Sequence, residues 1–274
     1  MLNNISFGQY YPKNSFVHKM DARIKLLLTV LYIVTIFLVQ TYSGYIATFL
    51  ALISVIIVAR IPLKTVLKSV KAVIFLIIFT VILNVLFYKG EEILCSWWIF
   101  TIHKGAIDFA IRMALRLLFL VMGTSLLTFT TTPVELTDGL ESLMYPLKFI
   151  KFPVHDVAVI MSITLRFIPI LMEEADKIIM AQSSRGADYE SKNIIKKAKA
   201  MLPILIPLFI SAFRRAEELS LAMDSRCYNA TDKRTRYKKG KFTYRDLIGT
   251  LFFLAILAFV IVDNVVLKLL VFTI

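Results

Sequence analysis

The chain has few of the residues that build disulfides, metal sites or nucleotide sites. Its 274 residues include two cysteines, Cys95 and Cys227, which lie too far apart to indicate a disulfide framework or a zinc site. The three histidines, His18, His103 and His155, are scattered, and no apolar stretch holds a His-x-x-x-His or carboxylate cluster. These absences argue against an intramembrane metalloprotease. No glycine-rich Walker loop is present, so we do not expect the chain to hydrolyse nucleotide by itself.

Acidic residues are also in the minority. The chain has 19 Asp and Glu against 32 Lys and Arg, which gives a formal net charge of +13. It is nevertheless 58% hydrophobic, with a mean hydropathy of +0.74, and this combination favours a polytopic membrane protein with basic cytoplasmic loops. Nucleic-acid binding is disfavoured, because the basic residues are not interleaved with base-stacking aromatic residues on a soluble module.

Five apolar segments are predicted to cross the membrane as helices, which makes the fold class all-α. They are residues 24–40, 45–59, 72–87, 106–131 and 247–262. Cations flank the first two segments on one side, and the turn between those segments has none, so the positive-inside rule predicts a cytoplasmic amino terminus and an extracellular carboxyl terminus. We expect no cleavable signal peptide, because the first apolar run continues to spanning length.

The fourth predicted span carries two cations on one face. Arg112 and Arg116 lie one helical turn apart, with Asp108 as a possible counter-ion. Charges at membrane depth face protein, water or a partner. Two interpretations stay open: a contact that moves during a transport cycle, and a paired structural arginine near the end of the span.

Three parts of the chain are distinguished by their composition. Residues 1–132 hold an amino-terminal cytoplasmic segment and the first four transmembrane helices. Residues 133–230 are predicted to form a cytoplasmic coupling domain of long amphipathic helices, because charged residues interrupt their apolar stretches at helical spacing. Thr132, Pro133 and Glu135 are typical of a helix start, and this helix is expected to end near residue 147. Residues 231–274 form a basic loop and the last transmembrane helix.

The two long helices of the coupling domain share one ending. The first closes on Ser184-Arg185-Gly186 and the second on Ser225-Arg226-Cys227. At one fixed offset further positions coincide, namely Ala175 with Ala216, Asp176 with Glu217, and Ala181 with Ala222. An arginine at a helix end, followed by a glycine in the left-handed conformation, presents a fixed and permanently charged fork. Cys227 leaves the left-handed cap open at the second site.

Together these features resemble the transmembrane (T) component of energy-coupling factor transporters, the vitamin-uptake branch of the ABC importers. The resemblance covers essentially the whole chain. Its residues are an early Pro12, Ser15, His18, Asp21, Arg23 and Lys25 pattern, the segments Thr132-Pro133-Val134-Glu135-Leu136 and Leu165-Arg166-Phe167-Ile168-Pro169, and the two arginine signatures.

The resemblance implies a non-catalytic coupling subunit that works with three other chains. Two ABC-type ATPase subunits would receive the two signatures, Arg185 with Ser184 and Gly186, and Arg226 with Ser225 and Cys227. ATP and Mg would be bound by those subunits, and this chain would bind no cofactor or metal. The third partner would be a small membrane protein that binds the vitamin or other micronutrient, called the S component.

The S component would lie on the apolar faces of the two long helices. The candidate contact residues are Phe167, Ile170, Leu171, Leu205, Leu208 and Phe209. The alternative is that these side chains pack only on one another. Three prolines, Pro169, Pro203 and Pro207, are predicted either to act as hinges or to set the curve of the helices.

Two other functions stay open at this point. A membrane-embedded enzyme would make the arginine signatures incidental. A membrane scaffold that binds lipid or RNA would instead use the basic segment 231–245. The sequence does not indicate which compound is imported, because substrate choice in the resembled family lies in the S component.

Overall fold

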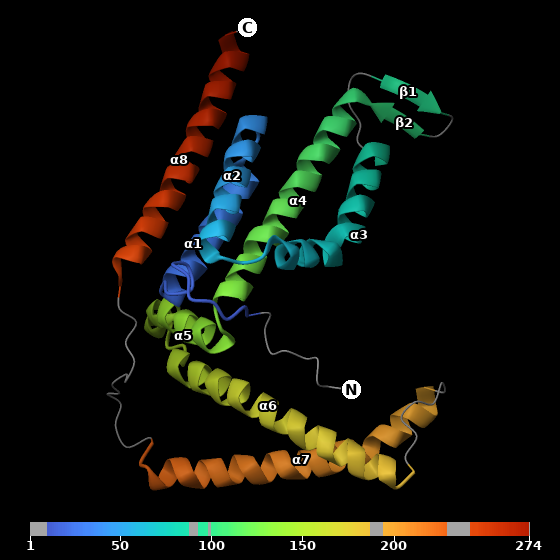
Figure 1. The fold of residues 1–274 in the computed structure, drawn as a ribbon, viewed down its shortest axis with the longest axis vertical. Helices are drawn as coiled ribbons and strands as arrows, with labels where there is room; N and C mark the ends of the chain where they lie inside the picture. Colours follow the sequence, from blue (N-terminus) through green and yellow to red (C-terminus); the bar gives the residue numbers. More distant parts are fainter. Residues whose placement is uncertain (1–9, 88–92, 98–99, 187–193, 229–241, 274) are drawn as a thin grey trace. The chain divides into compact units, whose positions relative to one another are not determined.

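The computed structural model describes residues 10–87, 93–97, 100–186, 194–228 and 242–273. The described chain is helical apart from one short β-hairpin (Figure 1). Its packing separates two compact units. The two-helix unit lies within residues 155–240, and the large unit comprises residues 8–154 and 241–274. The domain boundaries expected at residues 132 and 230 stay predictions.

The elements follow the chain in a simple order. In the large unit they are α1 (Ala22–Leu38), α2 (Tyr42–Ala59), α3 (Leu63–Phe87), β1 (Ile93–Trp97), β2 (Phe100–His103), α4 (Lys104–Thr130), α5 (Pro133–Leu143), the 3-10 helix η1 (Tyr145–Ile150) and α8 (Tyr244–Thr273). The two-helix unit consists of α6 (Val154–Ser184) and α7 (Ile194–Ser225).

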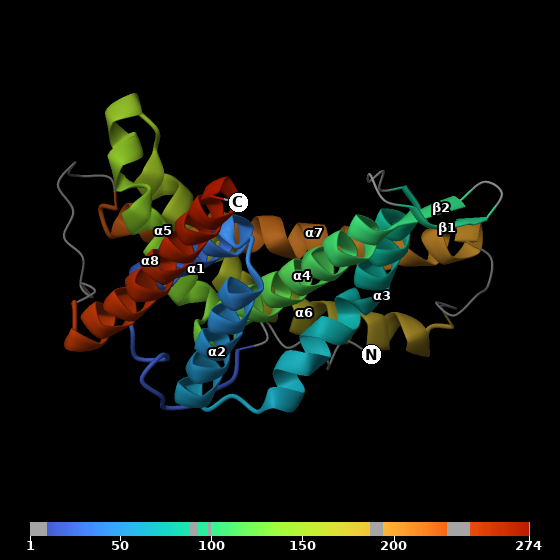
Figure 2. The same cartoon turned by 90° about the horizontal axis from the view of Figure 1, so that it is seen from above.

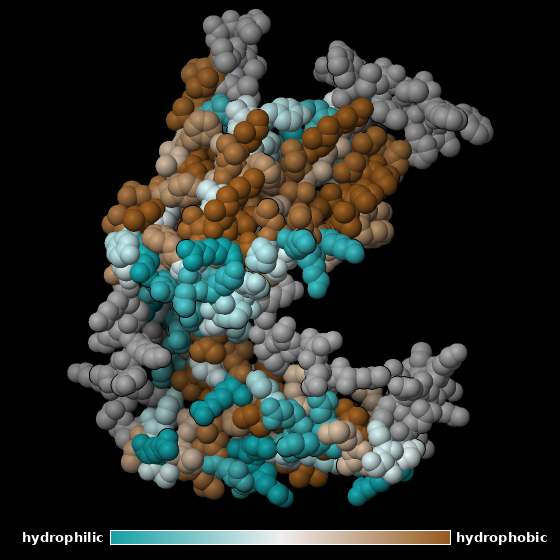
Figure 3. All heavy atoms as spheres, in the orientation of Figure 1, coloured by the Kyte–Doolittle hydropathy of each residue, from teal (hydrophilic) through white to brown (hydrophobic). Residues whose placement is uncertain are grey.

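Five described helices are long and apolar enough to cross a membrane: α2, α3, α4, α6 and α8. The number agrees with the sequence prediction, but that prediction counted α1, which has 17 residues, and left out α6. The α6 helix continues through Pro169, so its apolar half belongs to one 31-residue helix. Figure 3 shows apolar side chains across the visible face of the large unit, as on a surface that meets lipid. The all-α polytopic membrane fold is therefore confirmed.

The core of the large unit is built around α1, which packs against α4, α5 and α8 (Figure 2). The ring of Tyr32 lies directly over Gly123 of α4, and its hydroxyl donates a hydrogen bond to the Phe119 carbonyl at 2.8 Å. Small residues let transmembrane helices approach closely, and Gly123 has this role here.

The predicted start of α5 is confirmed as a reciprocal capping box. The Thr132 hydroxyl accepts from the Glu135 amide at 3.3 Å, and the Glu135 carboxylate accepts from the Thr132 amide at 3.2 Å. The helix ends at Leu143, earlier than expected, and η1 continues the chain as a tighter helix. Pro146 near the start of η1 provides the reason, since it has no amide hydrogen to continue the α-helical ladder.

The two arginines of α4 bind the end of α1. Arg116 donates to the Val39 carbonyl at 3.2 Å, and Arg112 donates to the Gln40 carbonyl at 3.3 Å while it pairs with Asp108. Carbonyls at a helix end lack intrahelical donors, and cations stabilise that end. The structure therefore favours the structural interpretation of this pair.

The hairpin between α3 and α4 was not predicted from the sequence. Strands β1 and β2 pair antiparallel, with Trp97 opposite Phe100. Residues 88–92 and 98–99 of the same loop lie outside the described residues, as does most of the basic segment 231–245.

Candidate functional site

The first arginine signature closes α6 with a glycine cap. Gly186 has a φ of +87°, and its amide donates to the Ser183 carbonyl at 3.0 Å. The Ser184 hydroxyl donates to the Met180 carbonyl at 3.0 Å, so it satisfies the last turn of its own helix. Arg185 is thereby fixed between the helix and its left-handed cap.

The second signature has the same geometry in spite of its cysteine. Cys227 has a φ of +53°, in the left-handed region. Its amide donates to the Asp224 carbonyl at 2.9 Å, and the Tyr228 amide donates to the Met223 carbonyl at 3.1 Å. These two bonds form a Schellman motif. The cap that the sequence left open is therefore present, and Cys227 occupies a conformation that favours glycine.

Replacing Cys227 with glycine is expected to stabilise the end of α7 by about 1 kcal/mol, because a side chain is strained in the left-handed region. The amide of Tyr228 reports this directly, and its hydrogen exchange should slow. Ala222→Gly, a glycine in the last helical turns, is the matched control and should weaken the same helix end by about 1 kcal/mol. Faster exchange in Cys227→Gly would contradict the expectation.

All six signature residues are exposed. The Ser225 hydroxyl donates to the Ala222 carbonyl at 3.0 Å, so both serines bond to their own helix. Within the described residues, neither the Arg185 nor the Arg226 guanidinium has an ion-pair or hydrogen-bond partner. Two permanent charges are thus presented at two helix ends of the same form, each able to bind a carboxylate or carbonyl groups with two parallel hydrogen bonds.

A polar contact that the sequence analysis missed joins α6 to α7. Glu174 accepts hydrogen bonds from Nε and one terminal nitrogen of Arg215, at 3.2 and 3.0 Å, and also from the Ser211 hydroxyl. Glu174 and Arg215 are 41 residues apart, which is the offset that aligns Arg185 with Arg226. The alignment therefore held a signal: the position before the paired alanines 175 and 216 carries opposite charges in the two helices.

The candidate S-component residues fall into two classes. On α7, Leu205 and Phe209 are 40% and 60% exposed. They belong to a continuous apolar stripe at helical spacing, which comprises Leu202, Leu205, Ile206, Phe209, Ile210 and Phe213. The others are half-buried, namely Phe167, Ile170, Leu171 and Leu208. The stripe on α7 is thus the more open of the two candidate surfaces.

The three candidate hinge prolines lie inside unbroken helices. Pro169 is within α6, and Pro203 and Pro207 are within α7. The ribbon of α7 changes direction within its first half (Figure 1), as expected where proline removes a backbone hydrogen bond.

The early polar pattern of the sequence ties the amino-terminal segment to itself and to α4. The Nδ1 atom of His18 lies 2.7 Å from the Ser15 hydroxyl, and its Nε2 lies 3.0 Å from the Tyr11 carbonyl. Burial lowers the pKa of His18, so the neutral ring donates from Nε2 and accepts at Nδ1. Lys25 is 5% exposed and donates to the His18 and Thr130 carbonyls at 3.0 and 2.9 Å.

A second group of hydrogen bonds joins the start of α1 to the start of α8. The Asp21 side chain accepts from the Arg23 amide at 3.0 Å and caps α1. The buried Asp246 carboxylate accepts from the Asp21 amide at 2.9 Å and from the Thr243 amide at 2.8 Å. These motif residues therefore hold the large unit together.

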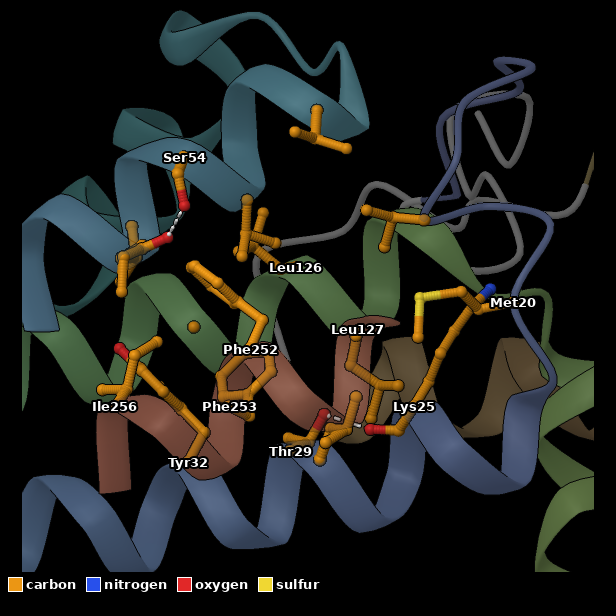
Figure 4. Close-up of a pocket in the computed structure, with 18 of the residues that line it drawn as sticks. Met20, Lys25, Thr29, Tyr32, Ser54, Leu126, Leu127, Phe252, Phe253 and Ile256 are labelled. Atoms are coloured by element: carbon orange, nitrogen blue, oxygen red, sulfur yellow. Dashed lines mark hydrogen bonds between the residues drawn. The ribbon is translucent and has the colours of Figure 1, made fainter. Parts of the chain in front are cut away.

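The large unit also contains a cavity of about 490 Å³ between α1, α2, α4 and α8 (Figure 4). Its lining is almost wholly apolar, with Phe252, Phe253 and Leu126 among its walls and Lys25 at its edge. The nearby hydroxyls of Tyr32 and Thr29 donate to backbone carbonyls. The cavity thus offers apolar contact, and these polar groups are already bonded.

The fold and the site together define a polytopic helical membrane protein that presents a pair of arginine-tipped helix ends. The CbiQ family model, described as cobalt transport protein, matches residues 13–237. The chain belongs to this family, as the transmembrane component of an energy-coupling factor transporter.

Curated relatives agree over nearly the whole length. The energy-coupling factor transporter transmembrane protein EcfT of Ruminiclostridium cellulolyticum is 48% identical over 250 residues, 91% of this chain and 93% of the relative. The EcfT protein of Clostridium kluyveri is 45% identical over 266 residues, 97% of this chain and 98% of the relative. That of Bacillus subtilis is 41% identical over 261 residues, 94% of this chain and 98% of the relative.

Proposed function

We propose that this transmembrane component couples ATP hydrolysis in two partner ATPase subunits to the movement of an S component during uptake of a vitamin or other micronutrient. The observation that carries the proposal is the pair of exposed arginines at two helix ends of matching geometry. A duplicated contact suits a duplicated partner, because two like ATPase chains present the same groove twice.

Each arginine tip offers a positive charge and a contact geometry that fixes how the partner is oriented. A guanidinium that binds a carboxylate or a pair of carbonyls through two hydrogen bonds fixes orientation as well as position. The left-handed caps at Gly186 and Cys227 hold the backbone beside Arg185 and Arg226 in one conformation. Force from the ATPase pair would therefore pass into rigid helices rather than into a flexible loop.

ATP and Mg are assigned to the ATPase subunits, and this chain is assigned no cofactor and no catalytic residue. When ATP draws the ATPase pair together, the two tips would move toward each other as parts of rigid helices. The differential contacts made in the open and closed states would supply the free energy for movement of the S component.

The S component is placed against the α7 stripe. Phe209 and Phe213 stack with ring centroids 6.4 Å apart, and Phe213 is 71% exposed. Exposed apolar side chains in a continuous stripe mark a binding surface for another apolar protein. Ile206 and Leu202 continue this surface by about one and two turns toward the start of the helix.

The orientation of the chain follows from its cations. The arginine tips need to lie on the cytoplasmic side, where ATP is available. Lys64, Lys68 and Lys71 lie in the first turns of α3, and their charge favours the same side. We therefore place the amino terminus and the two-helix unit in the cytoplasm and the carboxyl terminus outside, with α1 in place of α6 as the fifth span.

Purification of the wild-type chain in mild detergent tests the proposal. We expect two ATPase chains and one small hydrophobic membrane protein to copurify in fixed stoichiometry. A chain that purifies without an ATPase, although its partners are expressed in the same cells, would contradict the coupling function.

A further inference from the structure

The junction between α6 and α7 is made by a directional polar contact. The Glu174 carboxylate is held by two nitrogens of Arg215, at 3.2 and 3.0 Å, while its other oxygen accepts from the Ser211 hydroxyl. Ser211 and Arg215 are four residues apart, so they lie on one face of α7 and bracket the carboxylate along the helix axis. We call these three residues the Glu174 clasp.

The clasp is the same number of residues from the arginine tip in both helices. Arg185 follows Glu174 by eleven residues, and Arg226 follows Arg215 by eleven residues. At 1.5 Å per helical residue, each tip lies about 16 Å beyond the clasp. The two arms that end in Arg185 and Arg226 are therefore equal in length.

A slip of one helix past the other would destroy this equality. A slip of one turn moves a helix by about 5.4 Å along its axis. One arginine would then lie farther beyond the crossing point than the other. The neighbouring aromatic side chains do not prevent such a slip, because Phe209 and Phe213 are 60% and 71% exposed instead of filling the junction. Two donors that bracket one carboxylate do oppose it, since either direction of slip breaks a hydrogen bond.

We propose that the Glu174 clasp is the fulcrum of the two arms: Glu174, Ser211 and Arg215 are positioning residues that keep Arg185 and Arg226 at equal reach while the angle between the arms changes. This inference rests on the proposed coupling function, in which both tips are loaded by one ATPase pair. The two hydrogen bonds fix the guanidinium and carboxylate planes relative to each other, but the side-chain torsions of Glu174 and Arg215 still let the helix axes change their angle at this one level. A slip along the axes would instead stretch the hydrogen bonds of the clasp. The clasp thereby converts closure of the ATPase pair into a change of angle.

The distance between the tips is the direct test. Nitroxide labels at Ala181→Cys and Ala222→Cys occupy exposed and equivalent positions near the tips, in a background of Cys95→Ser and Cys227→Gly. The second change gives the second signature the glycine of the first, and the labelled background chain with Glu174 intact is the reference for distances, ATPase binding and uptake. In Glu174→Ala we expect a broader distribution of distances between the labels at positions 181 and 222. Uptake of the micronutrient that the S component binds should fall about tenfold. Both ATPase chains should stay bound, because each tip still carries its arginine.

Two further variants test whether Glu174 acts by positioning the two arginine tips or only by stabilising the fold. Glu173→Ala removes an exposed carboxylate next to Glu174 and should leave distances and uptake unchanged. The charge exchange Glu174→Arg with Arg215→Glu should narrow the distance distribution again and recover part of the uptake. An unchanged distribution in Glu174→Ala, or an exchange variant as broad as Glu174→Ala, would overturn the fulcrum.

The two proposals can fail separately. If the wild-type chain binds no ATPase, the coupling function fails, while the label distances in the isolated chain still report on the clasp. If both ATPases bind and uptake is intact in Glu174→Ala, the coupling function stands and the fulcrum is rejected.

Discussion

Replacing either tip arginine with glutamate is expected to abolish uptake and to loosen the ATPase subunits. In Arg185→Glu and in Arg226→Glu, a permanent cation at an exposed helix end becomes an anion. Each variant loses charge-assisted hydrogen bonds worth roughly 1.5–3 kcal/mol and gains repulsion from any acidic group in the groove. Uptake rate and ATPase copurification measure the two consequences, and the double variant should assemble worst.

Matched variants show whether uptake is lost because the arginine side chain is missing or because the protein no longer folds. Arg185→Lys and Arg226→Lys keep the charge but not the two-pronged geometry, so an intermediate loss is expected. Arg214→Glu makes the same charge change at an exposed position of α7 outside the signature and should leave ATPase association unchanged. Wild-type uptake by both single glutamate variants would remove the basis of the coupling function.

Much of the candidate site could be predicted because it is local. A helix end is encoded within a few residues, so Ser184-Arg185-Gly186 and its counterpart were visible as paired endings, and the structure places both helix ends there. The left-handed conformation of Cys227 could not be predicted, because cysteine carries no preference for it. It results from the Schellman bonds that the preceding helix imposes.

The contacts that depend on distant parts of the chain were missed. Asp246 meets Asp21 across 225 residues, and Lys25 meets Thr130 across 105. Their spacing has no periodicity, so a single sequence gives no sign of the pairing. Glu174 and Arg215 are intermediate: their shared offset was available, but only the approach of α6 to α7 at this point brings opposite charges at equivalent positions together.

The helices that have the length and hydropathy of a membrane span are not the same five that the sequence predicted: the structure adds α6 and omits α1. Apolar length made residues 24–40 a predicted span. The segment of α6 was left out because its apolar half is short for a span, is interrupted by Pro169 and is followed by a charged half. In the structure the helix passes through Pro169 without a break. Proline within a helix costs a hydrogen bond, but the surrounding turns keep the helix continuous where packing or lipid supports them.

Gly123→Ala is expected to destabilise the large unit by about 3 kcal/mol, although a glycine-to-alanine change inside a helix usually stabilises it by about 1 kcal/mol. A Cβ atom at this position would lie 1.9 Å from the Tyr32 ring. The ring cannot easily move away, because its hydroxyl is bound to the Phe119 carbonyl and its edge packs against Phe253. Helices α1 and α4 would have to separate, which lowers both the unfolding temperature in detergent and the yield of folded protein.

Gly249→Ala supplies the control in α8. The nearest atom to its added Cβ is the terminal methyl of Met20 at 2.6 Å, the end of a flexible side chain that can turn aside. This variant should therefore stay within about 1 kcal/mol of wild type. Adding Tyr32→Leu to Gly123→Ala removes the ring and should recover part of the lost stability. Equal unfolding temperatures for Gly123→Ala and Gly249→Ala would show that α1 and α4 are not held together by this close approach, because a steric origin requires the rigid ring and the flexible methionine to respond differently.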